Sequence, residues 1–111
     1  MVLADTSVWI DHFRKADTEL MRLLSAAQIY THAFVIGELA LGSIKQRELI
    51  IETMKNLPQA PMLQDAEVLE FIDRNKLAGK GIGYIDAHLL ASARFGGLTL
   101  WTKDKKLAQL V

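Results

Sequence analysis

The sequence contains no cysteine, no long apolar run and no excess of either charge. Without cysteine the chain has no disulfide framework, no thiolate zinc site and no thiol nucleophile, which removes several catalytic classes together. No apolar stretch approaches the roughly 18 residues that a membrane-spanning helix needs. Asp5 also interrupts the N-terminus before a signal-peptide hydrophobic region can form. We therefore expect a cytoplasmic protein with no membrane contact.

The charges balance, with 13 basic and 13 acidic residues. If four of the acids form a site of their own, 13 basic residues face nine acidic ones, an excess of four. Such a surface attracts a polyanion only modestly and in a salt-sensitive way. Charge alone therefore gives weak support to a nucleic-acid substrate.

The length of 111 residues fits one compact domain, residues 1–111, with room for a single core. Half of the residues are hydrophobic, a large share for so short a chain. Some apolar surface is therefore expected to be buried against a partner or a second copy.

Short apolar segments alternate with helical patterns along the chain. The expected strands are 1–4, 28–31, 60–63 and 98–101. The expected helices are 8–13, 18–25, 33–41, 44–57, 65–77 and 84–95, the last of them apolar on nearly every face. This alternation predicts an α/β fold with a parallel sheet, whose ligand sites lie beyond the carboxyl ends of the strands.

Four acidic residues lie in or beside apolar segments: Asp5, Glu38, Asp86 and Asp104. A buried carboxylate loses several kcal/mol of hydration, and two of them about 4 Å apart repel by roughly 4 kcal/mol at an effective dielectric near 20. If the four converge, they form an all-oxygen pocket that suits Mg²⁺ or Mn²⁺ and phosphate ligands. The pattern therefore points to phosphodiester hydrolysis.

Three of these four acids also have an ordinary structural explanation. Asp5 and Asp104 are suited to helix N-caps, and Asp86 to a first-turn position favoured by the helix dipole. Glu38 has no such explanation, because the positions three and four residues away on either side are apolar or glycine. We expect Glu38 and Asp86 on buried helical faces, where a metal or a distant basic residue must offset their charge.

Four segments around the acids form a recognisable set: LADTSVWI at 3–10, VIGELALG at 35–42, GYIDAHLLAS at 83–92 and LWTKDKKL at 100–107. In this order they resemble the motifs of PIN-domain ribonucleases of the VapC toxin type. The resemblance implies a three-layer α/β/α fold with a central parallel sheet of about four strands. Relatives continue past the position of Val111 into a further helix and strand, so a usual fifth strand is expected to be missing.

The resemblance also implies a site and its chemistry. Asp5, Glu38, Asp86 and Asp104 would bind one or two Mg²⁺ or Mn²⁺ ions that activate water for in-line attack on RNA. The hydroxyls of Thr6, Ser7 and Thr102 would orient these acids, although helix capping explains them too. The implied partners are an RNA substrate, a cognate VapB-type antitoxin and a second copy in a homodimer.

Other polar and aromatic residues have less specific roles. Candidate phosphate contacts, for which ordinary solvated charge is an equal alternative, are Arg14, Lys15, Lys80, Lys103, Lys105 and Lys106. The three histidines, at 12, 32 and 88, show no metal-binding spacing and are expected to be structural. Trp9 and Phe13, four residues apart, are expected in the core or a partner interface.

Three alternatives to a toxin remain open at this point. One is a PIN-like RNA-processing nuclease outside a toxin system, and another is a phosphatase on a different α/β scaffold. The third is a non-catalytic protein-binding module whose acids serve only as helix caps. Metal-dependent RNA cleavage separates the nucleases from the other two.

Overall fold

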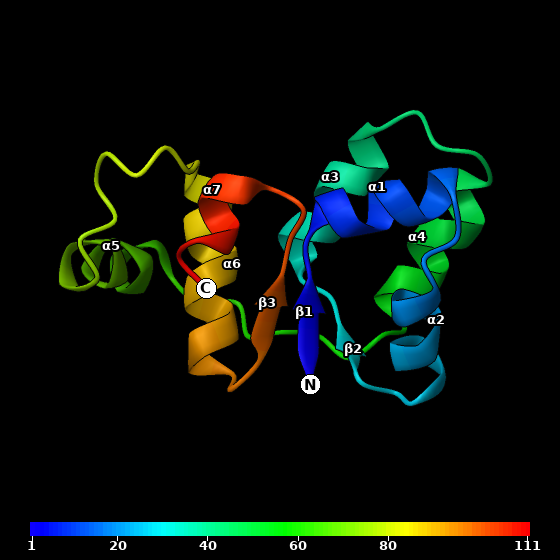
Figure 1. The fold of residues 1–111 in the computed structure, drawn as a ribbon, viewed down its shortest axis with the longest axis horizontal. Coiled ribbons are helices and arrows are strands. Elements are labelled where there is room, and N and C mark those ends of the chain that lie inside the picture. Colours follow the sequence, from blue (N-terminus) through cyan, green and yellow to red (C-terminus); the bar gives the residue numbers. More distant parts are fainter.

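A three-stranded parallel sheet forms the centre of the computed structural model, which describes all residues from Met1 to Val111 (Figure 1). The strands are β1 (Val2–Ala4), β2 (Ile29–Tyr30) and β3 (Thr99–Trp101), in the order β2-β1-β3. Both neighbours run parallel to β1. The carboxyl ends of all three strands therefore lie at one edge of the sheet.

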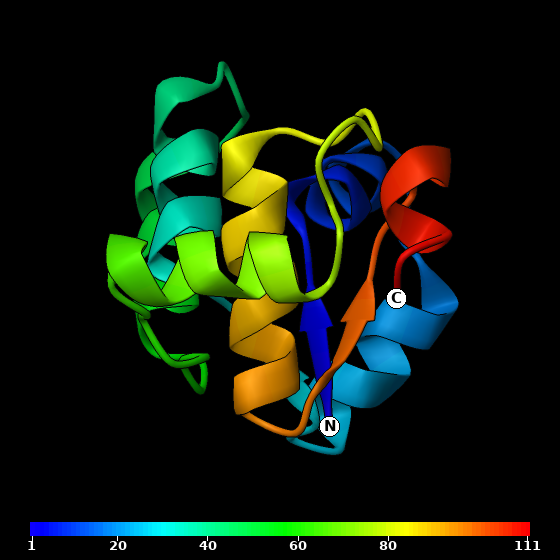
Figure 2. The ribbon, with the colours of Figure 1, turned by 90° about the vertical axis from the view of Figure 1, so that its left-hand side faces the viewer.

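Helices flank this sheet on both sides. They are α1 (Thr6–Arg14), α2 (Thr18–Ser25), α3 (Ala33–Leu41), α4 (Arg47–Lys55), α5 (Asp65–Arg74), α6 (Tyr84–Phe95) and α7 (Lys105–Ala108). Helices α5, α6 and α7 lie on one side of the strands, and α1, α2 and α4 lie on the other (Figure 1). Figure 2 shows α5 lying across α6. The predicted α/β fold with a parallel sheet is confirmed.

The expected strand at 60–63 is wrong. The chain there makes only an isolated parallel bridge between Thr31 and Gln59. Thr31 donates its N–H to the carbonyl of Pro58, and Ala60 donates to the carbonyl of Thr31. The ladder stops because Pro58 and Pro61 have no N–H to donate. The sheet therefore has three strands rather than about four.

Two helices are shorter than the apolar pattern predicted. α4 begins at Arg47 rather than at position 44, since Gln46 before it has a left-handed backbone with φ 54°. α5 ends at Arg74 rather than at 77, because Lys76 has φ 53° and Leu77 N–H bonds to the carbonyl of Ile72. A left-handed residue followed by such a bond is a common helix C-terminus.

The core packs α6 against the sheet, as the apolar pattern of this helix predicted, and also takes buried residues from α1, α2, α3, α4 and α7. All seven residues from Ala87 to Ala93 are buried. Trp9 of α1 is also buried, and its ring centroid lies 6.2 Å from that of half-buried Phe13. Even α6, which has 12 residues, is too short to cross a membrane, and no other helix qualifies.

Candidate active site

Asp5 lies at the end of β1 and begins α1. Its Oδ1 accepts hydrogen bonds from the Ser7 N–H at 2.9 Å and the Ser7 hydroxyl at 2.5 Å, so it caps the helix as the sequence suggested. Its Oδ2 accepts from the Thr102 hydroxyl at 2.5 Å. Only 5% of Asp5 is exposed. Hydroxyl donors from two distant segments thus fix the orientation of this buried carboxylate.

The turn after β3 brings Asp104 to the same edge of the sheet. Thr102 Oγ1 accepts the Asp104 N–H at 3.0 Å, and Ser7 Oγ accepts the Lys103 N–H at 2.9 Å. Asp104 Oδ1 caps α7 by accepting the Leu107 N–H at 2.9 Å. Thr102 therefore joins Asp5 directly to the backbone of the turn that carries Asp104.

Glu38 projects from the middle of α3, and its environment differs from the expectation. Its Oε1 accepts a hydrogen bond from the Thr6 hydroxyl at 2.6 Å. The residue is exposed, not on a buried face, and nearby Leu41 is 91% exposed. The prediction failed because apolar neighbours in the sequence do not reveal which side of a short helix meets solvent. This side opens beside the N-terminus of α1.

Asp86 lies in the first turn of α6 and is half-buried rather than fully buried. Its Oδ2 accepts the Gly83 N–H at 3.2 Å, an interaction that lowers its pKa. Burial nevertheless raises the pKa of Asp86 above its ordinary value, and the charges of Asp5, Asp104 and Glu38 raise it further. The other three sequence-predicted acids therefore lie close enough to Asp86 for their charges to act on it.

The donor set suits a hard divalent cation, because all four groups are carboxylates and they share one edge of the sheet. As they stand, no three acidic or histidine side chains lie close enough together to enclose an ion. Ionised carboxylates in one pocket repel, and each of these four is turned to an N–H or O–H donor. The residues thus provide the right ligand chemistry, with each carboxylate hydrogen-bonded within the protein and no three of them gathered around one point.

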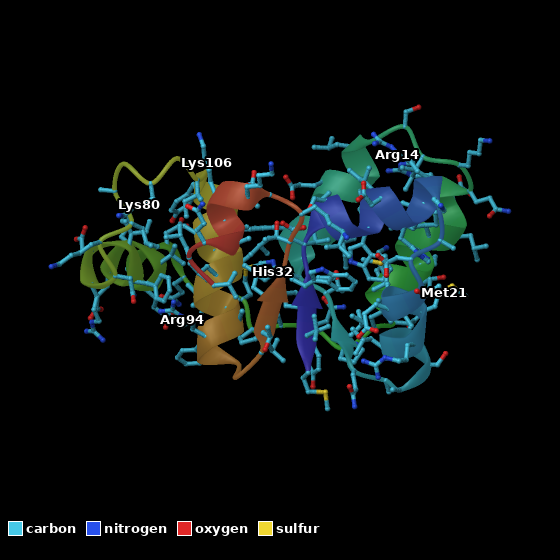
Figure 3. All side chains as sticks on the ribbon, in the orientation of Figure 1. Arg14, Met21, His32, Lys80, Arg94 and Lys106 are labelled. Atoms are coloured by element: carbon cyan, nitrogen blue, oxygen red, sulfur yellow. The ribbon has the colours of Figure 1, made fainter.

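The candidate phosphate contacts lie on both sides of this edge. Figure 3 shows Lys80 and Lys106 on the α5–α7 side and Arg14 on the α1–α4 side. Arg14, Lys80 and Lys105 are exposed. Lys103 is also exposed, but its Nζ lies 3.8 Å from Asp17 Oδ2 and 5.5 Å from the centre of the Trp101 ring. Its charge is therefore partly satisfied within the protein.

Two buried histidines beside the site form contacts that the sequence did not predict. His32 Nδ1 accepts the Phe34 N–H at 3.0 Å and begins α3, while its Nε2 lies 3.2 Å from Ser92 Oγ. His88 Nε2 lies 3.2 Å from Asp65 Oδ1, which also accepts the Tyr84 hydroxyl at 2.8 Å. In the sequence, the i, i+4 spacing of Tyr84 and His88 was the signal for a shared partner.

Residues 2–111 match the PIN domain family, and the chain belongs to it. Its similarity to VapC-type proteins is high. The chain is 50% identical over 108 residues to Ribonuclease VapC32 of Mycobacterium tuberculosis, in strain CDC 1551 / Oshkosh and in strain ATCC 25618 / H37Rv. The alignment covers 96% of this chain and 87% of each relative. The resemblance stated from the four motifs is confirmed.

Proposed function

We propose that this protein is a metal-dependent endoribonuclease and the toxin of a VapBC-type toxin–antitoxin system. Residues 1–111 would act as one PIN-like nuclease domain, with Asp5, Glu38, Asp86 and Asp104 as its metal ligands and catalytic acids. The observation that carries the proposal is that the charges of Asp5, Glu38 and Asp104 all raise the pKa of Asp86, which places the four acids in one cluster. The 50% identity to two proteins named as ribonucleases supports RNA as the substrate.

A bound Mg²⁺ or Mn²⁺ would acidify a coordinated water and offset charge on the scissile phosphate. The chain's own residues prepare for this chemistry. Ser7 and Thr102 hold both oxygens of Asp5 in fixed directions, and the Thr6 hydroxyl holds Glu38. Burial and the neighbouring carboxylates raise the pKa of Asp86, and a nearby cation would favour its ionised form. No side-chain nucleophile is needed.

RNA would approach over the exposed edge that carries the acids. Arg14, Lys80 and Lys105 are the proposed phosphate contacts, and Lys103 is a weaker one because Asp17 lies near its ammonium group. We propose a homodimer and a VapB-type antitoxin as protein partners. Exposed Leu41 (91%) offers one apolar contact for such partners. We place the activity in the cytoplasm.

An RNA-cleavage assay tests the proposal. Purified protein is mixed with a fluorogenic RNA in the presence of Mn²⁺ or of a chelator. The variant Asp5→Asn and the control variant Asp11→Asn are assayed in the same way. Each variant removes one negative charge, at the N-cap of α1 or within that helix, but Asp11 is exposed and lies outside the carboxylate cluster. Asparagine is also a good N-cap, so the fold is retained.

We expect cleavage only with Mn²⁺, retained in Asp11→Asn and lost in Asp5→Asn. Absent cleavage in all samples would favour the non-catalytic binding module, and equal cleavage in all samples would refute a reaction that depends on the metal and on Asp5. A toxin and an RNA-processing nuclease differ in the cell: only the toxin arrests growth on expression and is rescued by its cognate antitoxin. Mapping the RNA fragments after brief expression identifies the target.

A further inference from the structure

The first turn of α6, which carries Asp86, has no side-chain cap from the residue before it. Its N-cap is Gly83, which has no side chain to accept the free N–H groups. The side-chain bond to the backbone at this helix start comes from Asp86 itself, through Gly83 N–H. A ligand carboxylate that is also the cap needs another group to fix the turn, because metal binding competes for its oxygens.

Asp65, the first residue of α5, supplies that group. Tyr84 and His88 lie one helical turn apart on the same face of α6, and both contact Asp65 Oδ1, at 2.8 Å and 3.2 Å. The pKa of Asp65 is lowered by these hydrogen bonds, that of Tyr84 first, so the carboxylate is ionised and can only accept. His88 Nε2 must therefore carry a proton and donate it.

The other side of His88 reaches α3. Its ring contacts Phe34 edge-on with centroids 4.8 Å apart, and it contacts Tyr84 at the same distance. Phe34 lies four residues before Glu38, on the same face of α3. A single line of contacts thus runs from Asp65 through His88 to the helix that carries Glu38. The spacing of α3 and α6 decides how far Glu38 lies from Asp86.

Packing alone does not explain a histidine at position 88. It is 2% exposed, and its Nδ1 is buried without a hydrogen-bond partner. An apolar side chain of similar size would avoid that unpaired acceptor. The polar contact to Asp65 accounts for an imidazole at this position, and the residue that it contacts is 80% exposed at the side chain.

We propose that Asp65 is a positioning residue of the carboxylate site, fixing Asp86 through Tyr84 and His88 and setting the distance to Glu38 through Phe34. This inference rests on the proposed metal-dependent function. Asp65 does not touch the reacting atoms. Removing its side chain should therefore reduce the free energy of Mn²⁺ binding by more than it reduces the free energy of unfolding.

The test measures Mn²⁺ binding to the full chain from the electron paramagnetic resonance signal of free Mn²⁺. Urea unfolding without metal measures the stability of each variant separately. Asp65→Ala is compared with Glu70→Ala, which removes the same charge from the same helix and breaks only an exposed pair with Arg74. Asp65→Asn keeps an oxygen that accepts from both donors. Tyr84→Phe removes one donor and leaves Asp65 charged, which covers the case in which Asp65→Ala fails to fold.

We expect Asp65→Ala to bind Mn²⁺ about tenfold more weakly, the lower end for residues that orient metal ligands. Tyr84→Phe should weaken binding by a smaller factor, while Asp65→Asn and Glu70→Ala stay close to the unaltered protein. Equal affinity in Asp65→Ala and Glu70→Ala, or equal loss in Asp65→Asn and Asp65→Ala, would overturn the positioning role. If the unaltered protein binds no Mn²⁺, the proposed function fails instead.

Discussion

His32 should make the fold sensitive to mild acid. Its side chain is completely buried, and burial, followed by the charge of His88, lowers the pKa of His32 from 6.5 to about 4. Protonation would also remove the lone pair on Nδ1 that accepts the Phe34 N–H and caps α3. The neutral imidazole is therefore part of the folded structure.

The sign of the pH effect follows from the lowered pKa. Between pH 6.5 and pH 4 the unfolded chain binds a proton at His32 and the folded chain does not, so the free energy of unfolding falls as the pH falls. The contribution is complete above pH 6.5. With about 1.4 kcal/mol per pKa unit, the loss is roughly 2 kcal/mol between pH 7 and pH 5 and roughly 3 kcal/mol by pH 4.

Urea unfolding of the metal-free protein at pH 7 and pH 5 measures this loss, with His32→Asn as the comparison. Asparagine can cap α3 but does not titrate, so the variant starts less stable and responds less to pH. Other titrating groups contribute to both proteins and cancel in the difference. We expect the unaltered protein to lose about 2 kcal/mol more than the variant. Equal losses in the two proteins would refute the role assigned to His32.

Two further predictions concern the carboxylates. Thr102→Val removes the hydroxyl that orients Asp5, and we expect about tenfold weaker Mn²⁺ binding, whereas Thr99→Val, at an exposed position of the preceding strand β3, should bind normally. Glu38→Gln removes one of the charges that raise the pKa of Asp86, so carboxyl carbon-13 titration of the metal-free protein should show this pKa fall, with no change in Asp11→Asn. An unchanged Asp86 pKa in Glu38→Gln would mean that the two groups are not coupled.

Local pattern predicted several elements well. The bounds of α2, α3 and α6 agree with the expected helices because capping residues and glycines mark their ends. The apolar composition of 60–63 predicts a strand, but Pro58 and Pro61 block the ladder and leave an isolated bridge at Gln59. The start of α4 and the end of α5 differ from the predicted bounds because Gln46 and Lys76 adopt left-handed conformations there. Such positions are usually recognised in a sequence by a glycine, and neither residue is one.

The sequence by itself determined which four of the 13 acidic residues are predicted to form a site, because they lie in four motifs in a fixed order. Tertiary structure alone decided how they are held. Thr102 orients Asp5 across 97 positions of sequence, and Asp65 reaches His88 across 23. It also placed Glu38 on an exposed side of α3. Residue type limits what a side chain can bind, but its partners and its exposure to solvent depend on packing between segments far apart in the chain.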